Sequence, residues 1–119
     1  MKTYRDLIVW QKSMLIVLLV FKETLCFPKE EVYGLTAQIR ISAVSIPSNI
    51  AEGYGRNSTG DYIRFLQIAS GSLYEFQTQL EICLQLGLKK EKFEEIKSLS
   101  IEIEKMLSSL LSKVKDSRK

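Results

Sequence analysis

The chain has 119 residues, of which 45% are hydrophobic and 26% charged, a size and composition that suit one soluble domain with a single core. With only two prolines and six glycines, it has too few turn residues for many short strands, so a few long helices are favoured. Basic and acidic residues balance over residues 1–112, so the net charge of +3 arises within residues 113–119.

The first helix is predicted over residues 4–26. Thr3 and Asp6 have the spacing of a capping box at its start, and Pro28 ends it. The stripe predicted to face the core consists of Leu7, Trp10, Met14, Leu18 and Phe21. Apolar residues also cover almost all of the remaining circumference of this helix, so we expect a second subunit to cover its outward side. The residues expected at that subunit interface are Ile8, Leu15, Ile16 and Leu19.

The second helix is predicted over residues 29–53, because apolar residues recur every three or four positions from Leu35 to Ile50. Pro47 lies inside this pattern and predicts a kink. Asn49, Glu52 and Arg56 are spaced by three and four residues, so they can share one face. We favour a structural polar network that braces the kink, with a recognition patch at the end of the bundle as the alternative.

The third helix is predicted over residues 59–86, with a second capping box at Ser58 and Asp61, and the fourth over residues 90–115. Both have the alternating three- and four-residue apolar spacing of a bundle seam. Four helices of similar length with short connections predict an all-α fold, an antiparallel up-down-up-down four-helix bundle that forms a single domain over residues 1–119.

Most catalytic chemistry is excluded by composition. The chain has no histidine, which rules out the Glu-x-x-His pairs of di-iron bundles and the triads of hydrolases. Cys26 and Cys83 do not have metal-ligand spacing and are expected to be reduced thiols of a cytoplasmic protein. The apolar run from Met14 to Phe21 is far shorter than the roughly 20 residues of a membrane span. We expect no enzyme, no cofactor and no metal.

Several stretches resemble one protein family. They include Asp6–Lys12, Tyr33–Arg40, Gly71–Glu75 and, most specifically, SIPSNIAEGYGR at Ser45–Arg56. These motifs resemble the 23S ribosomal RNA intervening-sequence protein family, closely over residues 5–87 and by pattern alone in the fourth helix, with one departure at Phe76, where the family often has leucine.

The resemblance implies a four-helix bundle without catalytic activity. Such proteins are encoded within some bacterial ribosomal RNA genes, and similar proteins form five-membered rings. A relative assists a reverse transcriptase and binds nucleic acid through a basic ring surface. The resemblance therefore implies a homo-oligomer, a pentamer, with RNA or a nucleic-acid enzyme as a further partner and no membrane partner.

Two functions remain open. The resemblance and the basic tail favour a non-enzymatic oligomeric scaffold associated with RNA or a nucleic-acid-processing partner, whereas the near-neutral body favours a structural or regulatory protein–protein interaction module with no nucleic-acid role. So short a tail also suits a helix C-terminus, where the helix dipole favours cations. The candidate contacts to nucleic acid or a partner are Arg40, Arg56, Arg64, Lys113, Lys115, Arg118 and Lys119.

Overall fold

The computed structural model describes residues 2–29, 32–88 and 91–117 of the chain. Within these ranges it contains helices and no strand, which confirms the all-α class. In chain order the elements are η1 (Tyr4–Asp6), α1 (Ile8–Glu23), η3 (Val32–Thr36), α2 (Ala37–Tyr54), α3 (Thr59–Gln85) and α4 (Phe93–Ser117).

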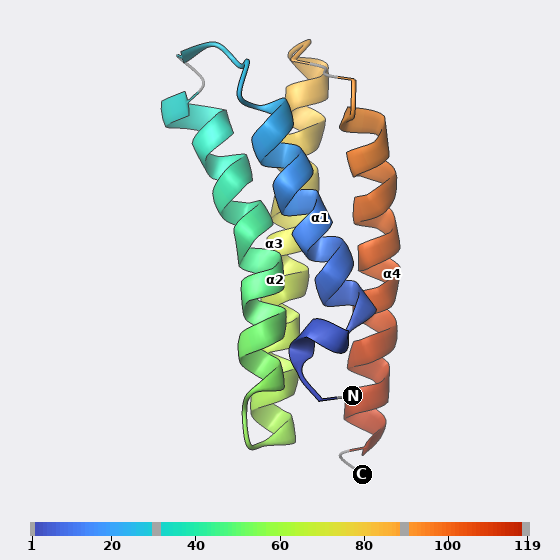
Figure 1. Cartoon of the computed structure of the whole chain (residues 1–119). Coiled ribbons are helices and arrows are strands. Elements are labelled where there is room, and N and C mark those ends of the chain that lie inside the picture. The colour runs from blue at the N-terminus through green and yellow to red at the C-terminus, as the bar shows by residue number, and fades with distance from the viewer. Residues whose placement is uncertain (1, 30–31, 89–90, 118–119) are drawn as a thin grey trace.

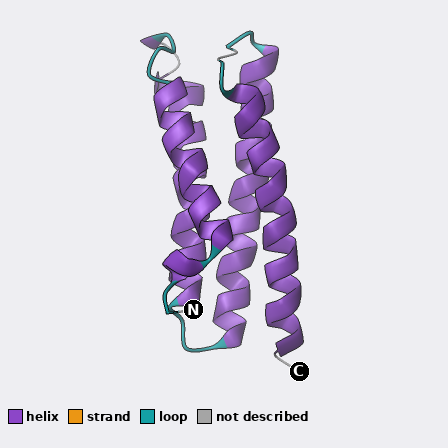
Figure 2. Ribbon diagram, turned by 45° about the vertical axis from the view of Figure 1, so that its right-hand side comes forward, coloured by secondary structure: helices purple, strands orange, loops and turns teal. Residues whose placement is uncertain are grey.

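The four α-helices lie side by side in an elongated bundle of 49 × 24 × 22 Å (Figure 1). Followed from blue to red, the chain ascends along α1, descends along α2, ascends along α3 and descends along α4. Figures 1 and 2 place both termini near the loop that joins α2 to α3. We call this the terminal end of the bundle and define it by residues 2–7, 54–64 and 113–117.

The first two helices begin later than expected. The capping box of Thr3 and Asp6 forms, but it caps the single turn η1, and the extended Leu7 separates η1 from α1. The Leu7 side chain is buried, so the break turns an apolar residue into the core. The second helix was expected from residue 29. Instead α2 begins at Ala37, after η3, in which the backbone of Gly34 is not helical, with φ −115° and ψ −109°. Residues 30–31 lie outside the described residues.

The remaining helix ends lie close to their predicted positions. Ser58 caps α3 by accepting a hydrogen bond from the amide of Asp61, and Gly87 follows α3 with a φ of 78°. The helix α2 continues through Pro47 from Ala37 to Tyr54. A kink at Pro47 remains a prediction.

The core lies along the bundle axis and takes residues from every α-helix, as the apolar spacing predicts. Its fully buried members come at helical intervals, and Phe76 fills the position where the family resemblance led us to expect leucine. They include Ile16 and Val20 in α1, Ile39, Ile46 and Ile50 in α2, Leu66, Leu73 and Phe76 in α3, and Phe93, Ile96, Ile103 and Leu107 in α4.

Close contacts and polar bonds join α2 to α3. A Cβ added to Gly53 would lie 2.7 Å from the Cβ of Phe65, so the two backbones approach there as only glycine permits. Farther along, the Ser45 and Ser72 hydroxyl oxygens are 2.8 Å apart, and the buried Ser42 hydroxyl donates to Oε1 of Gln79 at 2.6 Å. These bonds fix the register of the pair.

No helix in the described ranges is both long enough and apolar enough to cross a membrane.

Candidate functional site

The described residues do not form a metal centre. Among them no group of three or more histidine, cysteine, aspartate or glutamate residues is placed to hold a metal ion. Of the two cysteines, Cys26 is exposed and Cys83 is buried. The candidate sites are therefore surfaces.

The outward side of α1 is apolar, as expected, but its residues differ from those predicted. Ile8 is 57% exposed and Leu15 45%, whereas Leu19 is half-buried. Ile16 is wrong as an interface candidate, because its side chain is fully buried in the core of its own chain. The outer face of α1, as we call this surface, consists of Ile8, Leu15, Leu18 and Phe21, with Leu25 just beyond the helix.

Leu18 is an exposed apolar residue that the sequence analysis did not place on the outward side of the helix. It is 64% exposed, and Phe21 is 39% exposed, although both fit the predicted core stripe. The reason is that α1 is apolar on nearly all sides, so the stripe that contains Ile16 and the stripe that contains Leu18 have equal claim to the core. No local signal in the sequence separates them.

An apolar groove between α1 and α2 adjoins the outer face of α1. Its cavity has a volume of about 300 Å³, and the rings of Tyr4 and Trp10 meet edge to face at 5.1 Å beside it. Ile41, which precedes Val44 by about one turn of α2, is 70% exposed. The groove is lined by Tyr4, Trp10, Met14, Val17, Val44, Pro47, Ser48 and Ala51.

A second groove, of about 420 Å³, lies between the start of α1 and the last part of α4. Its lining is largely apolar, and Lys105 and Lys113 line it together with Asp6. Hydrogen bonds from the amides of Lys2 and Thr3 hold the pKa of the Asp6 carboxyl below its usual range. The apolar lining consists of Leu7, Ile8, Val9, Met106 and Leu110.

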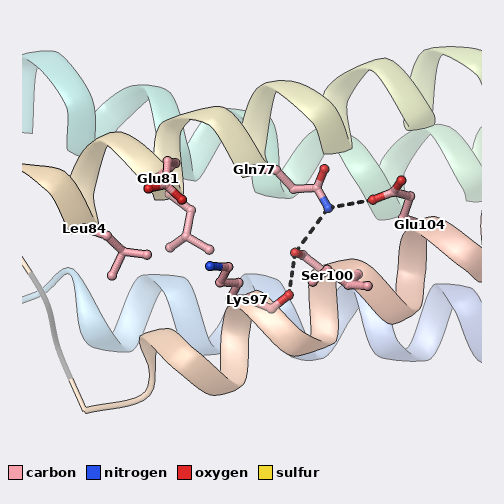
Figure 3. A pocket seen from close by; sticks show the side chains of 8 residues that line it. Gln77, Glu81, Leu84, Lys97, Ser100 and Glu104 are labelled. Atoms are coloured by element: carbon pink, nitrogen blue, oxygen red, sulfur yellow. Dashed lines mark hydrogen bonds between the residues drawn. The ribbon is translucent and has the colours of Figure 1, made fainter.

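A third groove, between α3 and α4, is crossed by polar contacts (Figure 3). Nε2 of Gln77 donates to Oγ of Ser100 at 3.3 Å and to Oε1 of Glu104 at 3.1 Å, and the Ser100 hydroxyl donates to the carbonyl of Lys97 at 2.8 Å. The cavity of about 260 Å³ is thus bridged by bonds within the chain. These bonds connect α3 to α4 across the groove.

The three candidate arginines do not gather at one end. Arg56 and Arg64 lie at the terminal end, each with its guanidinium carbon 4.7 Å from the centroid of the Phe65 ring. Arg40 lies near the other end, where its Nε donates to the Thr24 hydroxyl at 2.8 Å and its guanidinium covers the Phe21 ring. Arg40 therefore cannot share a contact surface at the terminal end with the other two, because Arg40 and Arg56 stand sixteen residues apart in sequence, about 24 Å along a helix.

The basic tail is partly described. Lys113 and Lys115 are exposed in the last turns of α4, at the terminal end. The other two candidates, Arg118 and Lys119, lie outside the described residues. Val114, between the two lysines, packs against the core, so α4 remains part of the bundle up to this point.

The predicted polar network forms only in part. Nη2 of Arg56 lies 3.6 Å from Oε1 of Glu52, whereas Nδ2 of Asn49 donates to the carbonyl and the hydroxyl of Ser45 at 2.7 and 2.9 Å. Asn49 therefore joins the serine contacts between α2 and α3, away from the exposed Glu52. Sequence spacing showed that the three residues can share a face but not which neighbour each one meets.

Two tyrosines complete the terminal end. The rings of Tyr54 and Tyr62 meet edge to face at 6.1 Å. Burial, and secondarily the neighbouring Tyr54, raises the pKa of the Tyr62 hydroxyl. Arginines and aromatic rings thus lie together around the loop from α2 to α3.

Comparison with known proteins identifies relatives of this bundle. Residues 5–109 match the sequence profile of the 23S rRNA-intervening sequence protein. Among solved structures, a protein of unknown function from the S23 ribosomal protein family of Bacteroides thetaiotaomicron is similar, with a TM-score of 0.80 and 26% sequence identity over 88% of this chain and 96% of that one. No curated protein matches the chain.

Proposed function

The chain belongs to the 23S rRNA-intervening sequence protein family, and from this premise we propose that it is a non-enzymatic oligomeric scaffold associated with RNA or with a nucleic-acid-processing partner. Subunits associate through the outer face of α1, and the terminal end contacts the nucleic acid. The observation that carries the proposal is the exposure of the outer face of α1 in a single chain.

Self-association is supported by the size and shape of that apolar surface. Four large apolar side chains of one helix, with Leu25 beyond it, are between 39% and 75% exposed, and the groove between α1 and α2 extends the surface sideways. A soluble monomer rarely exposes a contiguous apolar patch of more than a few hundred Å², and each Å² removed from water contributes about 25 cal/mol. A second copy of the chain covers this face, and the family resemblance gives five subunits.

Contact with nucleic acid is supported by the charges at the terminal end. Arg56, Arg64, Lys113 and Lys115 lie there, and the chain continues into Arg118 and Lys119. One copy carries too little excess charge to hold a phosphate backbone well. A ring of copies that point the same way multiplies these contacts on one surface, because linked sites bind as a unit.

Light scattering tests the oligomer. At micromolar concentration the protein should have several times the chain mass of 13.7 kDa, and Leu18→Glu should reduce it toward one chain, since a carboxylate would be buried in the interface. The matched control is Ser98→Glu on the exposed side of α4, which should leave the mass unchanged. A wild-type protein that runs as a monomer at this concentration contradicts the scaffold.

Mobility-shift assays with generic RNA test the second part of the proposal, contact with nucleic acid. The variant carrying Lys113→Gln, Lys115→Gln, Arg118→Gln and Lys119→Gln keeps Val114 in the core, so α4 stays intact. This variant should bind RNA more weakly, and its affinity should depend less steeply on salt, because each phosphate contact that is lost reduces the number of counterions released on binding. If the intact oligomer shifts no RNA even at low salt, the RNA part of the proposal fails.

In that case a structural or regulatory protein–protein interaction module becomes the better account. The groove between α1 and α4 favours the interaction module. Its volume is about 420 Å³ and its lining is largely apolar, with Lys105 and Lys113 outnumbering Asp6, so it suits an acidic, partly apolar partner segment. Binding to a purified partner that persists in high salt, together with no RNA binding, would support this function.

A further inference from the structure

We propose that Arg56 and Arg64, held on the ring of Phe65, form a two-arginine clamp for the phosphates of an RNA strand. The clamp specifies which groups at the terminal end touch the nucleic acid, and in this respect it rests on the proposed function. It involves neither the basic tail nor Arg40.

The geometry of the clamp is set by one aromatic ring. Both guanidinium carbons lie 4.7 Å from the centroid of Phe65, so they are no more than twice that distance apart. The ring itself is buried and belongs to α3. Among the described residues, Phe65 is the one ring with two arginines over it; Tyr4 and Phe21 each carry one. Two planar donors thus lie close together before any ligand arrives.

Each guanidinium keeps most of its hydrogen-bonding capacity. Arg56 meets Glu52 at 3.6 Å and Arg64 meets Asp61 at 3.8 Å, in each case through one nitrogen. A guanidinium has five N–H donors in a fork that matches phosphate oxygens. The four side chains of the two pairs are between 43% and 59% exposed, and ion pairs this exposed contribute little. A phosphate can therefore replace either carboxylate.

The surroundings leave the clamp open to solvent. Gly55, Arg56, Asn57 and Ser58 form an exposed loop, so a strand can approach without any displacement of the helices. The same loop leads into the N-terminus of α3, where the helix dipole adds partial positive charge.

Arg40 provides an internal control. It also stacks on a ring, that of Phe21, but its Nε is bonded to Thr24 and it lies near the opposite end of α2. Arg40 therefore shares the stacking on a ring with Arg56 and Arg64 but has no second arginine on the same ring. If RNA binds at the clamp, substitution of Arg56 or Arg64 should weaken RNA binding and substitution of Arg40 should not.

RNA affinity of the full-length oligomer at low salt, measured by fluorescence anisotropy, is the primary test. Arg56→Gln and Arg64→Gln should each weaken binding about tenfold, as the loss of one charged hydrogen-bonded contact does. Arg56→Lys, which keeps the charge and loses the planar fork, should also weaken it, and Arg40→Gln should leave it unchanged. Unfolding midpoints serve as the folding control.

Glu52→Gln separates a clamp from a merely structural cluster. Removing this carboxylate frees Arg56 for phosphate, so RNA should bind more tightly, although the ion pair within the protein is lost. A structural role predicts no more gain than Asp116→Asn, which removes an exposed carboxylate from the same end without freeing either arginine. If the wild type binds RNA and the arginine variants bind equally well, the clamp is wrong while the proposed function stands.

If the wild type binds no RNA, the proposed function fails and calorimetric titration with inorganic pyrophosphate decides the clamp. Saturable binding that is lost in the Arg56→Gln, Arg64→Gln double variant and kept in Arg40→Gln supports it. Binding that is absent, or equal in all three proteins, overturns it.

Discussion

The α2–α3 pair and the helix α1 occupy the same bundle but are held in different ways. Small residues and buried polar bonds join α2 to α3, at Gly53 against Phe65, at Ser42 with Gln79 and at Ser45 with Ser72. The core face of α1, with Ile16 and Val20, is apolar, and its outer face is apolar as well. Between helices, the polar contacts of the α1 segment lie at its margins, where Lys12 meets Glu102 and Thr24 meets Arg40.

The contrast shows how the two regions specify their neighbours. Directional bonds and a tight backbone approach allow one register, so α2 and α3 are specific to each other. Apolar contacts are non-directional, so α1 can bury one face against its own chain and the other against a second copy. We expect substitutions at the contacts between α2 and α3 to affect stability and not assembly, and substitutions in α1 to affect stability or assembly according to the face.

The largest effect is expected at the core face of α1. Ile16→Ala should destabilise the fold by about 2–5 kcal/mol, since it removes buried methylene groups and leaves a cavity. Leu15→Ala, one residue away on the outer face, should change the unfolding free energy of the dissociated chain little and weaken assembly instead. Chemical denaturation and light scattering measure the two quantities. Equal losses of stability from both variants at low protein concentration would contradict the division into two faces.

Gly53→Ala is expected to rank next. The new methyl group would lie 2.7 Å from the Phe65 Cβ, and overpacking of this kind costs about 1–3 kcal/mol. Gly71→Ala in α3 is the control, because nothing lies within 4 Å of its added Cβ and alanine should stabilise the helix by up to about 1 kcal/mol. Thermal unfolding of both variants should shift in opposite directions, and a shift of the same sign would count against the close approach.

Ser42→Ala tests the polar bonds of the pair. It leaves Oε1 of the buried Gln79 without its donor, which should cost about 1–3 kcal/mol. Replacing both residues, Ser42→Ala with Gln79→Met, should recover part of that loss, because no unsatisfied acceptor remains. The control Ser48→Ala alters an exposed hydroxyl bonded within α2 and should have little effect. Denaturant midpoints that fall no further for Ser42→Ala than for Ser48→Ala would show that the bond is dispensable.

The smallest effects are expected from pH, and they have opposite signs in the two regions. Tyr62, in the pair, has a pKa raised above 10.0 by burial and by Tyr54, so its contribution is complete below pH 10 and declines as the pH rises through the raised value. Asp6, before α1, has a pKa lowered below 3.8 by the Lys2 and Thr3 amides, so its contribution is present above that pH and is lost in stronger acid. Tyr62→Phe and Asp6→Asn should flatten the alkaline and acid limbs of the stability curve respectively. A limb left unchanged by its own variant would contradict the assignment.

Much of the fold could be predicted because the signals are local. Three- and four-residue apolar spacing gave the four helices, and Ser58 gave the start of α3, since a cap depends on residues within one turn. The late start of α2 was missed because Pro28 and the acidic residues after it look like a helix start, whereas Gly34 departs from helical geometry downstream. The capping box at Thr3 was correct in its bonds and wrong in the element that it caps.

The chemical character of the candidate surfaces could be predicted, but not the residues that form them. That α1 has too many apolar residues for one core is a property of composition, so an exposed apolar face was foreseeable. Which residues form it was not, because a helix that is apolar all round gives no preferred direction, and Leu18 and Ile16 exchange the roles expected of them. Lys113 and Lys115 lie in the last turns of α4, at the terminal end, because the order of the helices and the length of α4 place them there.

The sequence by itself determined the helices, the single all-α core and the lack of histidine chemistry, because each depends on residue identity and near-neighbour spacing. Only the tertiary structure decided which face of α1 is turned outward, that Asn49 meets Ser45, and that Arg56 and Arg64 share the ring of Phe65 while Arg40 lies far away. Spacing fixes the angle of a side chain about its own helix axis, whereas its neighbours depend on how that helix is rotated and shifted against the others. Packing between helices sets that rotation, and it involves residues that are distant along the chain.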